Sequence, residues 1–451
     1  MKEGLSSNIE SRTIKKVAWR LLPLLIICYI IASIDRGNIS YAASGGMTAD
    51  LGLSATQYGF AAGVFFISYF IFEIPSNLML EKFGARKWIA RIMITWGVLA
   101  MAAAFVDRAW TLYLMRFLLG AAEAGFFPGV ILYMTYWFPK SYRGRVVAAF
   151  VFSVPISNGI AAAVSGWLLG MHGLLGFAGW QWLFLIEGIP AVVLAVAVLI
   201  FLTDRPEQAK WLNEEERTWL SSTISAERAE VLAQEGDRPG FWSTFADTRV
   251  LAITAIYFAN LIATWGITFF MPHIVKLMGK SDLETGLLSS LPYFFTPLGL
   301  LVLSWSSDRT GERKWHCVFG AMLGAVGLAL AGFYSNGVLA LAGFAIASAG
   351  LFGARGPLWA MPAEFLTGVR AAVGIAFINA VGNLGGLVGP PIIGWIKDQT
   401  GDYSMAVYFI AASAATSALL GILISPAKSE QKAEMLTAGL KQESQLKPSA
   451  S

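Results

Sequence analysis

The chain has 451 residues, of which 56% are hydrophobic and only 14% are charged. Soluble domains carry about a quarter of their residues as charged side chains, so this composition excludes a soluble protein and a disordered chain. The formal net charge of +4 is too small to indicate a nucleic-acid partner. The two cysteines and three histidines are scattered, which excludes a disulfide framework. We expect neither a metal site nor a cofactor.

Twelve apolar runs follow one another along the chain. A run of about 20 mostly apolar residues can cross a bilayer as a helix. These runs are continuously apolar rather than alternating, which indicates helices and not a barrel. The first run is longer than the apolar part of a signal peptide, so we expect it to remain as a spanning helix. The predicted spans are 17–41, 56–80, 88–106, 110–138, 145–170, 180–202, 249–275, 285–307, 315–334, 337–360, 371–397 and 403–424.

A polar stretch divides the runs into two sets of six. The predicted organisation is an N-terminal six-helix bundle at 1–202, a cytoplasmic linker at 203–248, a C-terminal bundle at 249–425 and a tail at 426–451. The short loops after even-numbered runs are richer in Lys and Arg than those on the opposite side, which places both termini in the cytoplasm. We expect a monomer in a lipid bilayer, the inner membrane of a bacterium.

The loops that follow the second and eighth runs share one spaced pattern. The copies are Asn77-x-x-x-Glu81-Lys82-x-Gly84-x-Arg86-Lys87-Trp88 and, 227 residues later, Ser304-x-x-x-Asp308-Arg309-x-Gly311-x-Arg313-Lys314-Trp315. An acid beside a basic turn can pair with a neighbouring helix end and hold one conformation closed. This favours a gating role for Glu81, Arg86, Asp308, Arg309 and Arg313; the alternative is that the basic residues only fix the topology. Parallel repeats are a transporter architecture, with the site near the midplane between the halves.

Several charged residues, Glu73 and Glu187 among them, fall at membrane depth inside the runs. An ionisable side chain at bilayer depth costs at least about 2.5–3.5 kcal/mol and marks a functional site by default. Asp35 and Arg36 lie in the first run, and Arg355 in the tenth. Arg116 and Glu123 are seven residues apart in the fourth run, hence on one helix face and roughly 10 Å apart along the axis.

In a shared cavity, three arginines and two acids leave a net positive charge that grows when the acids bind protons. Such a cavity attracts an organic anion, whose carboxylates fit the guanidinium fork. Asp35 and Glu123 are therefore the candidate proton-coupling residues, and Arg36, Arg116 and Arg355 the candidate substrate ligands. The alternatives are structural: Asp35 and Arg36 as a pair in a broken first helix, and Arg116 and Glu123 as an interhelical pair.

Several other residues are weaker candidates. Asn379 and Asn383 are four apart on the eleventh helix, hence on one face, and are candidate substrate ligands. Tyr69 and Trp359 are candidate aromatic walls. We assign a packing or gating role to Glu73, a structural role to Glu187, and no specific role to His273. Asn260, Thr264, Ser157 and Asn158 are further polar candidates.

Four stretches resemble the anion:cation symporter family of the major facilitator superfamily. They are Ile34-Asp35-Arg36-Gly37-Asn38; Arg116 to Gly129 with Gly120, Glu123, Gly125 and Pro128; Gly356-Pro357-Leu-Trp359; and Asn379-Ala-Val-Gly382-Asn383-Leu-Gly385-Gly386. Two more, Phe72-Glu73-Ile-Pro75-Ser76-Asn77 and Tyr136-Trp137-Phe138-Pro139, are similar to the tartrate-transporter-like branch.

The resemblance implies the major facilitator fold, with twelve helices in two pseudo-symmetric bundles, and proton- or cation-coupled uptake of organic anions such as tartrate, sugar acids or aromatic acids. It places the coupling acids at Asp35 and Glu123, the anion-binding arginines at Arg36 and Arg116, and a helix-11 asparagine at Asn379. Some sugar-acid members have a tyrosine where this chain has Ser33, which weakens transfer of that specificity.

We therefore expect a transporter that takes up a small organic anion with protons by alternating access. An anion exchanger or an uncoupled facilitator is the alternative within transport. An anion-sensing membrane receptor is the alternative from another class. An embedded enzyme is a third, but the sequence shows no nucleophile–base or metal-ligand spacing, so we expect no catalytic residue.

Overall fold

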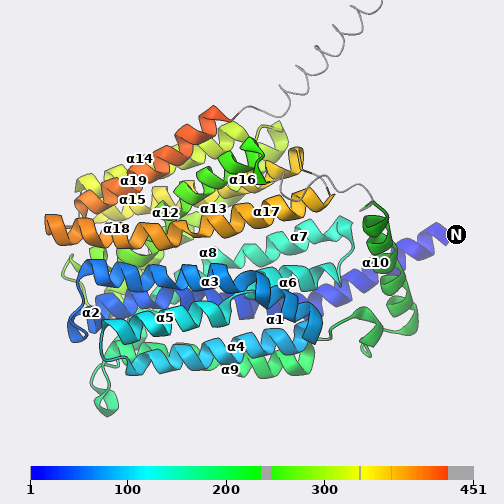
Figure 1. Cartoon of the computed structure of the whole chain (residues 1–451), viewed down its shortest axis with the longest axis horizontal. Helices are drawn as coiled ribbons and strands as arrows, with labels where there is room; N and C mark the ends of the chain where they lie inside the picture. The colour runs from blue at the N-terminus through cyan, green and yellow to red at the C-terminus, as the bar shows by residue number, and fades with distance from the viewer. Residues whose placement is uncertain (1, 235–244, 335–336, 367, 425–451) are drawn as a thin grey trace, which may run out of the picture.

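The computed structural model describes residues 2–234, 245–334, 337–366 and 368–424 (Figure 1). Within them, twelve helical stretches are long and apolar enough to cross a membrane, which confirms the predicted all-α membrane fold. Each overlaps one predicted run; the predicted tail at 426–451 lies outside the described residues. The stretches are Ile9–Asp50, Ala55–Phe83, Ala85–Phe105, Ala109–Thr135, Lys140–Leu169, Gly179–Phe201, Thr248–Lys276, Asp282–Thr310, Lys314–Tyr334, Val338–Ala360, Val373–Thr400 and Ser404–Leu423.

The helices gather into two groups. The first is α1 (Lys2–Ala42), α2 (Thr48–Asp50), α3 (Ala55–Phe83), α4 (Ala85–Ala102), α5 (Ala109–Glu123), α6 (Phe126–Thr135), α7 (Lys140–Val151), α8 (Ser153–Leu169) and α9 (Gly179–Phe201). The second is α12 (Thr248–Lys276), α13 (Asp282–Thr310), α14 (Lys314–Tyr334), α15 (Val338–Gly353), α16 (Arg355–Ala360), α17 (Gly368–Asn383), α18 (Gly385–Thr400) and α19 (Ser404–Leu423). We call them the N-terminal and C-terminal bundles; α10 (Glu214–Gln234) lies between them in the sequence.

Four predicted spans are each divided into two helices: α5/α6, α7/α8, α15/α16 and α17/α18. The first break has a clear cause. Pro128 disfavours a continuous helix here, because its ring would crowd the carbonyl of Ala124. Ala124 leaves the helical conformation with ψ 134°, and Gly125 adopts φ +84°, a value that favours glycine. Breaks at membrane depth occur where the backbone is covered by protein or lines a cavity.

The first helix is not broken at Asp35 and Arg36. α1 continues through both residues to Ala42, and its irregular turn follows at Gly45 and Gly46. The alternative of a charge pair at a break in the first helix is therefore wrong.

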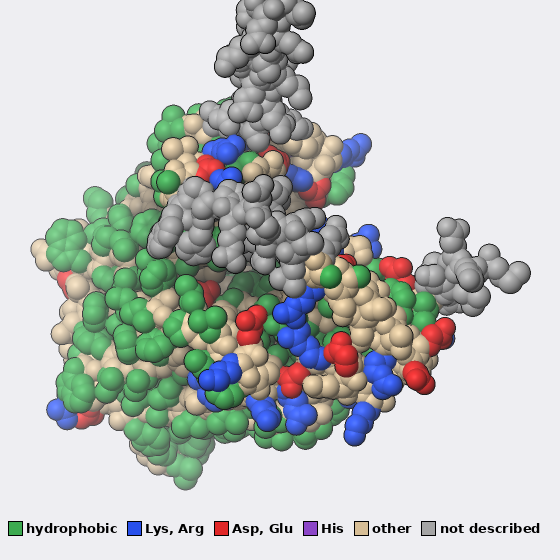
Figure 2. Space-filling model, turned by 45° about the vertical axis from the view of Figure 1, so that its right-hand side comes forward, with side chains coloured by type: hydrophobic (Ala, Val, Ile, Leu, Met, Phe, Trp, Pro, Cys, Tyr) green, Lys and Arg blue, Asp and Glu red, His purple; other side chains and the backbone are tan. Residues whose placement is uncertain are grey.

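The two ends of the molecule differ in charge. The N-terminus and α10 lie at one end of the helices, which we call the terminal end; α2 lies at the other, which we call the distal end (Figure 1). Figure 2 shows Lys, Arg, Asp and Glu side chains gathered where the terminal end comes forward, with hydrophobic side chains over the flank. An apolar flank between polar ends is what a bilayer requires.

The bundles pack tightly at the distal end through small residues. A Cβ atom added to Gly59 of α3 would lie 2.2 Å from the carbonyl oxygen of Pro390 in α18. On the other side of the interface, a Cβ atom added to Gly286 of α13 would lie 2.4 Å from the carbonyl oxygen of Ala162 in α8. Only small side chains allow helix backbones to approach this closely.

Hydrogen bonds reinforce this distal contact. The carboxylate of Asp398 in α18 accepts from the backbone amides of Ala55 and Thr56 at 3.0 and 2.8 Å, and from the Thr56 hydroxyl at 2.5 Å. The Tyr58 hydroxyl donates to the carbonyl of Phe269 at 2.8 Å. Asp398 thus caps the first turn of α3 from the opposite bundle. We call the Asp398–Ala55–Thr56 contact the distal latch.

Among the residues that the structure describes at the terminal end, the polar contacts lie within a bundle or attach the connecting segment. Arg143 of α7 pairs with Glu227 of α10 at 2.8 Å. In the C-terminal bundle Arg370 lies 3.7 Å from Asp247. Partial burial opposes ionisation of Asp247, but hydrogen bonds from Arg249 and the charge of Arg370 lower its pKa. The bundles are thus held together at the distal end.

Candidate functional site

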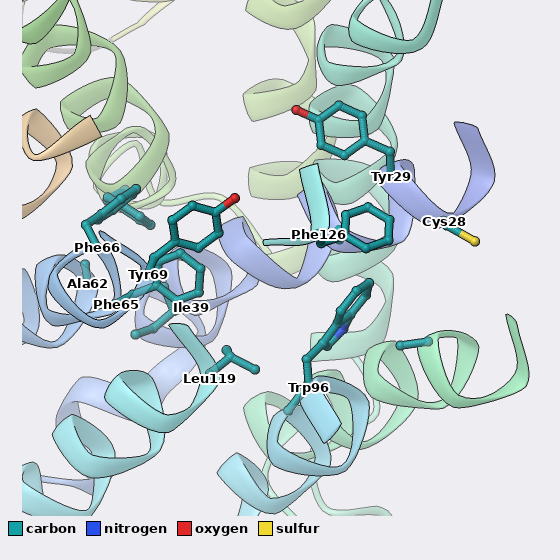
Figure 3. Packing of buried hydrophobic residues seen from close by; sticks show 14 of the residues in the cluster. Cys28, Tyr29, Ile39, Ala62, Phe65, Phe66, Tyr69, Trp96, Leu119 and Phe126 are labelled. Atoms are coloured by element: carbon teal, nitrogen blue, oxygen red, sulfur yellow. The ribbon is translucent and has the colours of Figure 1, made fainter. Parts of the chain in front are cut away.

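Arg36 and Glu123 form an ion pair inside the N-terminal bundle. Nη2 of Arg36, on α1, donates to Oε1 of Glu123, the last residue of α5. The Glu123 side chain is 1% exposed and the Arg36 side chain 16%. The guanidinium also lies 5.4 Å from the ring centre of Tyr69 and 5.7 Å from that of Phe65, which Figure 3 shows side by side on α3. Three of the predicted site residues, Arg36, Glu123 and Tyr69, therefore lie together.

Asp35 lies in a different environment from its neighbour Arg36. Trp96 of α4 donates to Asp35 Oδ2 at 2.6 Å, and Asn38 Nδ2 lies 3.4 Å from Asp35 Oδ1. The residue is 1% exposed. Asp35 thus belongs to the interior of the N-terminal bundle, whereas Arg36 reaches Glu123 and the aromatic residues of α3.

Arg116 is buried beside the same aromatic residues. Its Nε donates to the carbonyl of Ala61 at 3.3 Å, and its guanidinium lies 5.0 Å from the Phe65 ring centre. Nη1 and Nη2 are buried with no hydrogen-bond partner in the described structure. Phe65 is thus flanked by the guanidinium groups of Arg36 and Arg116, an arrangement that the sequence did not indicate.

Arg355 is the corresponding cation of the C-terminal bundle. It is the first residue of α16, at the break after α15. Its Nε donates to Asn260 Oδ1 at 3.2 Å and its Nη2 to Thr264 Oγ1 at 2.8 Å, both on α12. Its guanidinium lies 4.2 Å from the ring centre of Phe352. These partners are all neutral, so they orient the guanidinium without balancing its charge.

Two tyrosines lie near the cations of both bundles. Tyr29 of α1 is within electrostatic range of Arg36 and Glu123 and, across the interface, of Arg355. Tyr257 of α12 is within the same range of Arg355 and Arg36. Figure 3 shows the hydroxyl groups of Tyr29 and Tyr69 pointing toward the same space between the helices. Sequence reasoning missed Tyr29 and Tyr257, which place Arg36 and Arg355 on opposite sides of one site.

The remaining predicted ligands, Asn379, Asn383 and Trp359, lie in the C-terminal bundle. Asn383, at the end of α17, donates from Nδ2 to Oδ1 of Asn379 at 3.2 Å, and both residues are half-buried. Trp359 contacts Tyr257, with ring centres 5.0 Å apart. A Cβ atom added to Gly382 would lie 2.2 Å from Tyr257 Cδ1, so this tyrosine packs against α17 as well.

The predicted gating residues lie at the terminal end, away from this site. Arg313 pairs with Asp308 in its own loop and lies 3.8 Å from Glu364. Arg309 lies 5.4 Å from the ring centre of Trp305.

The first copy of the loop is arranged differently. The backbone amide of Arg86 donates to Asp204 of the connecting segment at 2.8 Å, and Glu81 is exposed. The structure thus brings Asp308 and Arg313 together, whereas the contact of Arg86 is with another segment.

Comparison with known proteins identifies the family. Residues 25–390 match the family model of the Major Facilitator Superfamily. The chain belongs to the major facilitator superfamily. A protein of Agrobacterium vitis named as a candidate tartrate transporter is 46% identical over 95% of this chain and 94% of its own. A quinolone resistance transporter of Acinetobacter baumannii is 43% identical over 90% of this chain and 93% of its own.

A solved structure shares the fold. The xylose transporter XylE of E. coli, in a partially occluded inward-open conformation, has a TM-score of 0.73 and 14% identity, and covers 91% of this chain and 98% of its own. These matches confirm the resemblance drawn from the sequence. The protein is a multi-pass membrane transporter of the superfamily and not an enzyme.

Proposed function

We propose that this major facilitator protein takes up a small organic anion together with protons by alternating access. Tartrate or another hydroxy, sugar or aromatic carboxylate is the proposed substrate class. The observation that carries the proposal is the placement of Arg36 and Arg355 on opposite bundles, with Tyr29 and Tyr257 each near both arginines. With Glu123 as the acid paired to Arg36, the site keeps one net positive charge.

Such a site suits a carboxylate anion that bridges the bundles. A guanidinium binds a carboxylate through two parallel N–H donors. Arg36 and Arg355 could each hold one carboxylate of a dicarboxylate, with hydroxyl groups near the side chains of Asn379 and Asn383. The relative named as a candidate tartrate transporter supports this class, because tartrate is a dicarboxylate.

The Arg36–Glu123 pair provides the coupling. While Glu123 is ionised, it occupies the Arg36 fork. A proton taken up on Glu123 removes that competing carboxylate, and Arg36 then donates its hydrogen bonds to the substrate. By linkage, the bound anion increases the affinity of Glu123 for the proton by the same factor. Proton and anion therefore enter and leave together.

We infer from the contact between the bundles at the distal end which side of the transporter is closed. We propose that both termini are cytoplasmic, because the terminal end carries the Lys- and Arg-rich loops. The tight distal packing and the distal latch then close the outer side, and the site opens toward the cytoplasm. The proposed location is a bacterial inner membrane, and the proposed active unit is a monomer.

Transport into vesicles that contain the purified protein tests the proposal. A pH gradient, acidic outside, should drive accumulation of labelled tartrate or of another carboxylate, and a protonophore should abolish it. Uptake that is indifferent to the gradient would indicate an exchanger or an uncoupled facilitator. Binding without uptake would indicate an anion-sensing receptor.

A further inference from the structure

A second polar cluster lies inside the N-terminal bundle. It contains two carboxylic acids, Asp35 of α1 and Glu187 of α9, and three neutral side chains around them. The cluster consists of Asp35, Asn38, Trp96, Ser165 and Glu187, which come from α1, α4, α8 and α9. From the sequence alone we gave Glu187 only a structural role.

Neutral donors hold the two acids. Trp96 donates to Asp35 Oδ2 at 2.6 Å, and Ser165 donates to Glu187 Oε1 at 2.8 Å. The Asn38 amide lies between them: Nδ2 is 3.4 Å from Asp35 Oδ1, and the side chain also interacts with Glu187. Oε2 of Glu187 and Oδ1 of Asn38 are buried without a hydrogen-bond partner in the described structure.

The cluster is closed off from lipid. Asp35 is 1% exposed and Glu187 is 5% exposed. Beside them, α4 and α9 are in backbone contact: a Cβ atom added to Gly188 would lie 2.8 Å from the carbonyl oxygen of Gly97. An unpaired carboxylate in such a place loses its hydration without gaining a cation.

The charges that face the cluster do not neutralise both acids. Asp35 lies near two other acids, Glu187 and Glu123, and near one cation, Arg116 of α5, while Tyr41 of α1 is a further titratable group near Glu187. Within the bundle, the buried acids are Asp35, Glu123 and Glu187, and the arginines beside them are Arg36 and Arg116. One negative charge is therefore left without a cation.

We propose that Asp35 and Glu187 share one bound proton, which makes Glu187 a second proton-coupling residue. The proton comes from water and forms an O–H bond on one of the two carboxylates, both of which lie beside Asn38. It leaves to water when the site reopens. One proton removes the repulsion between the acids and makes the bundle interior neutral. The role in coupling rests on the proposed symport.

Infrared titration of the purified protein tests the bound proton without transport. The wild type should show one protonated-carboxyl C=O stretch that shifts in D2O, from the shared proton. Glu187→Gln and Asp35→Asn should each remove this band. Either change leaves two buried acids for the two arginines, so that no acid has to hold a proton. Ser165→Ala is the matched control: it removes a hydrogen bond to Glu187 but keeps both acids, so the band should remain at a shifted frequency.

Transport tests the coupling separately. Glu187→Gln should lower gradient-driven uptake about tenfold, the equivalent of one pK unit of proton affinity, and leave counterflow exchange unchanged. The proposal is overturned if the wild type lacks the band, if Glu187→Gln retains it, or if sodium displaces it. If the band behaves as expected but wild-type uptake ignores the pH gradient, the proton site stands and the proposed symport fails.

Discussion

Arg36 is the residue on which the proposed site depends most. It is held by Glu123, and its guanidinium lies over the rings of Tyr69 and Phe65. A planar fork can stack on these rings and bind a carboxylate at the same time, which an ammonium group cannot do. The identity of the cation therefore matters, and not only its charge.

Two substitutions of Arg36 should weaken substrate binding to different extents. We expect Arg36→Lys to weaken binding about tenfold, the equivalent of 1.4 kcal/mol, because the charge remains but the fork is lost. Arg36→Ala should eliminate measurable binding. Calorimetry with tartrate measures both, and Arg108→Lys, an exposed residue that pairs with Asp107, is the control that should bind normally. Unchanged affinity of Arg36→Ala would remove Arg36 from the site.

Glu123→Gln should separate coupling from translocation. The variant keeps the shape of the side chain but cannot change its charge, so Arg36 is permanently free of the competing carboxylate. We expect gradient-driven uptake to be lost while counterflow of the same anion continues. Parallel measurements in one vesicle preparation make the comparison. Loss of both activities to the same extent would assign Glu123 a structural role.

Arg355 should determine the preference for a second carboxylate. It contacts neutral partners on α12, so its charge is available to a substrate. We expect Arg355→Gln to weaken tartrate binding about tenfold more than binding of a matched monocarboxylate, the equivalent of 1.4 kcal/mol. Competition binding measures the two affinities. Equal losses would show that Arg355 does not contact the second carboxylate.

At the scale of single residues, the sequence identified the charged residues at bilayer depth but not the side chains that surround them. Arg36, Glu123 and Arg355 stand out because charge at bilayer depth is costly. Tyr29, Tyr257 and Phe65 do not stand out among 13 tyrosines and 30 phenylalanines. Consecutive helical residues point about 100° apart. The different environments of Asp35 and Arg36 follow from that geometry, but which neighbours each one meets depends on the tertiary structure.

At the scale of helices, the spans were predictable and their breaks were not. Continuous hydrophobicity predicts twelve helices and their approximate ends. Breaks at Ala124 and Ala354 precede Pro128 and Pro357, whereas α3 and α12 continue through Pro75 and Pro272. Proline alone therefore does not predict a break, because neighbouring helices decide whether the freed backbone groups are satisfied. Glu123, Arg355 and Asn383 all lie beside such breaks.

The distal latch should bias the conformational equilibrium. Asp398→Ala removes a cap from the first turn of α3, worth about 1 kcal/mol, so we expect about a fivefold shift toward open distal ends. Spin-label distances between the distal ends of α3 and α18 would show the longer distance gaining population. Asp402→Ala is the matched control, because Asp402 accepts from the Ser404 amide within its own bundle. Equal distance distributions in the two variants would contradict the latch.

At the scale of the whole molecule, the charged residues occupy two kinds of place: the polar ends of the helices and the buried sites between them. Charged side chains gather at the terminal end on the face that Figure 2 shows, while Arg36, Glu123 and Arg355 form the site between the helices and Asp35 and Glu187 the second cluster. The repeated loop motif correctly indicated two related halves of a transporter. Its copies nevertheless make different contacts, because Asp204 of the connecting segment lies beside the first copy while the second pairs Asp308 with Arg313.

The most direct test of the central claim is uptake by proteoliposomes under an imposed pH gradient. Vesicles that are alkaline inside and acidic outside should accumulate the anion above its external concentration, and acidify their lumen as they do so. Glu123→Gln vesicles should do neither, although they exchange internal for external anion. Accumulation of the anion without proton entry, or equal uptake with and without the gradient, would contradict proton-coupled symport through Arg36 and Glu123.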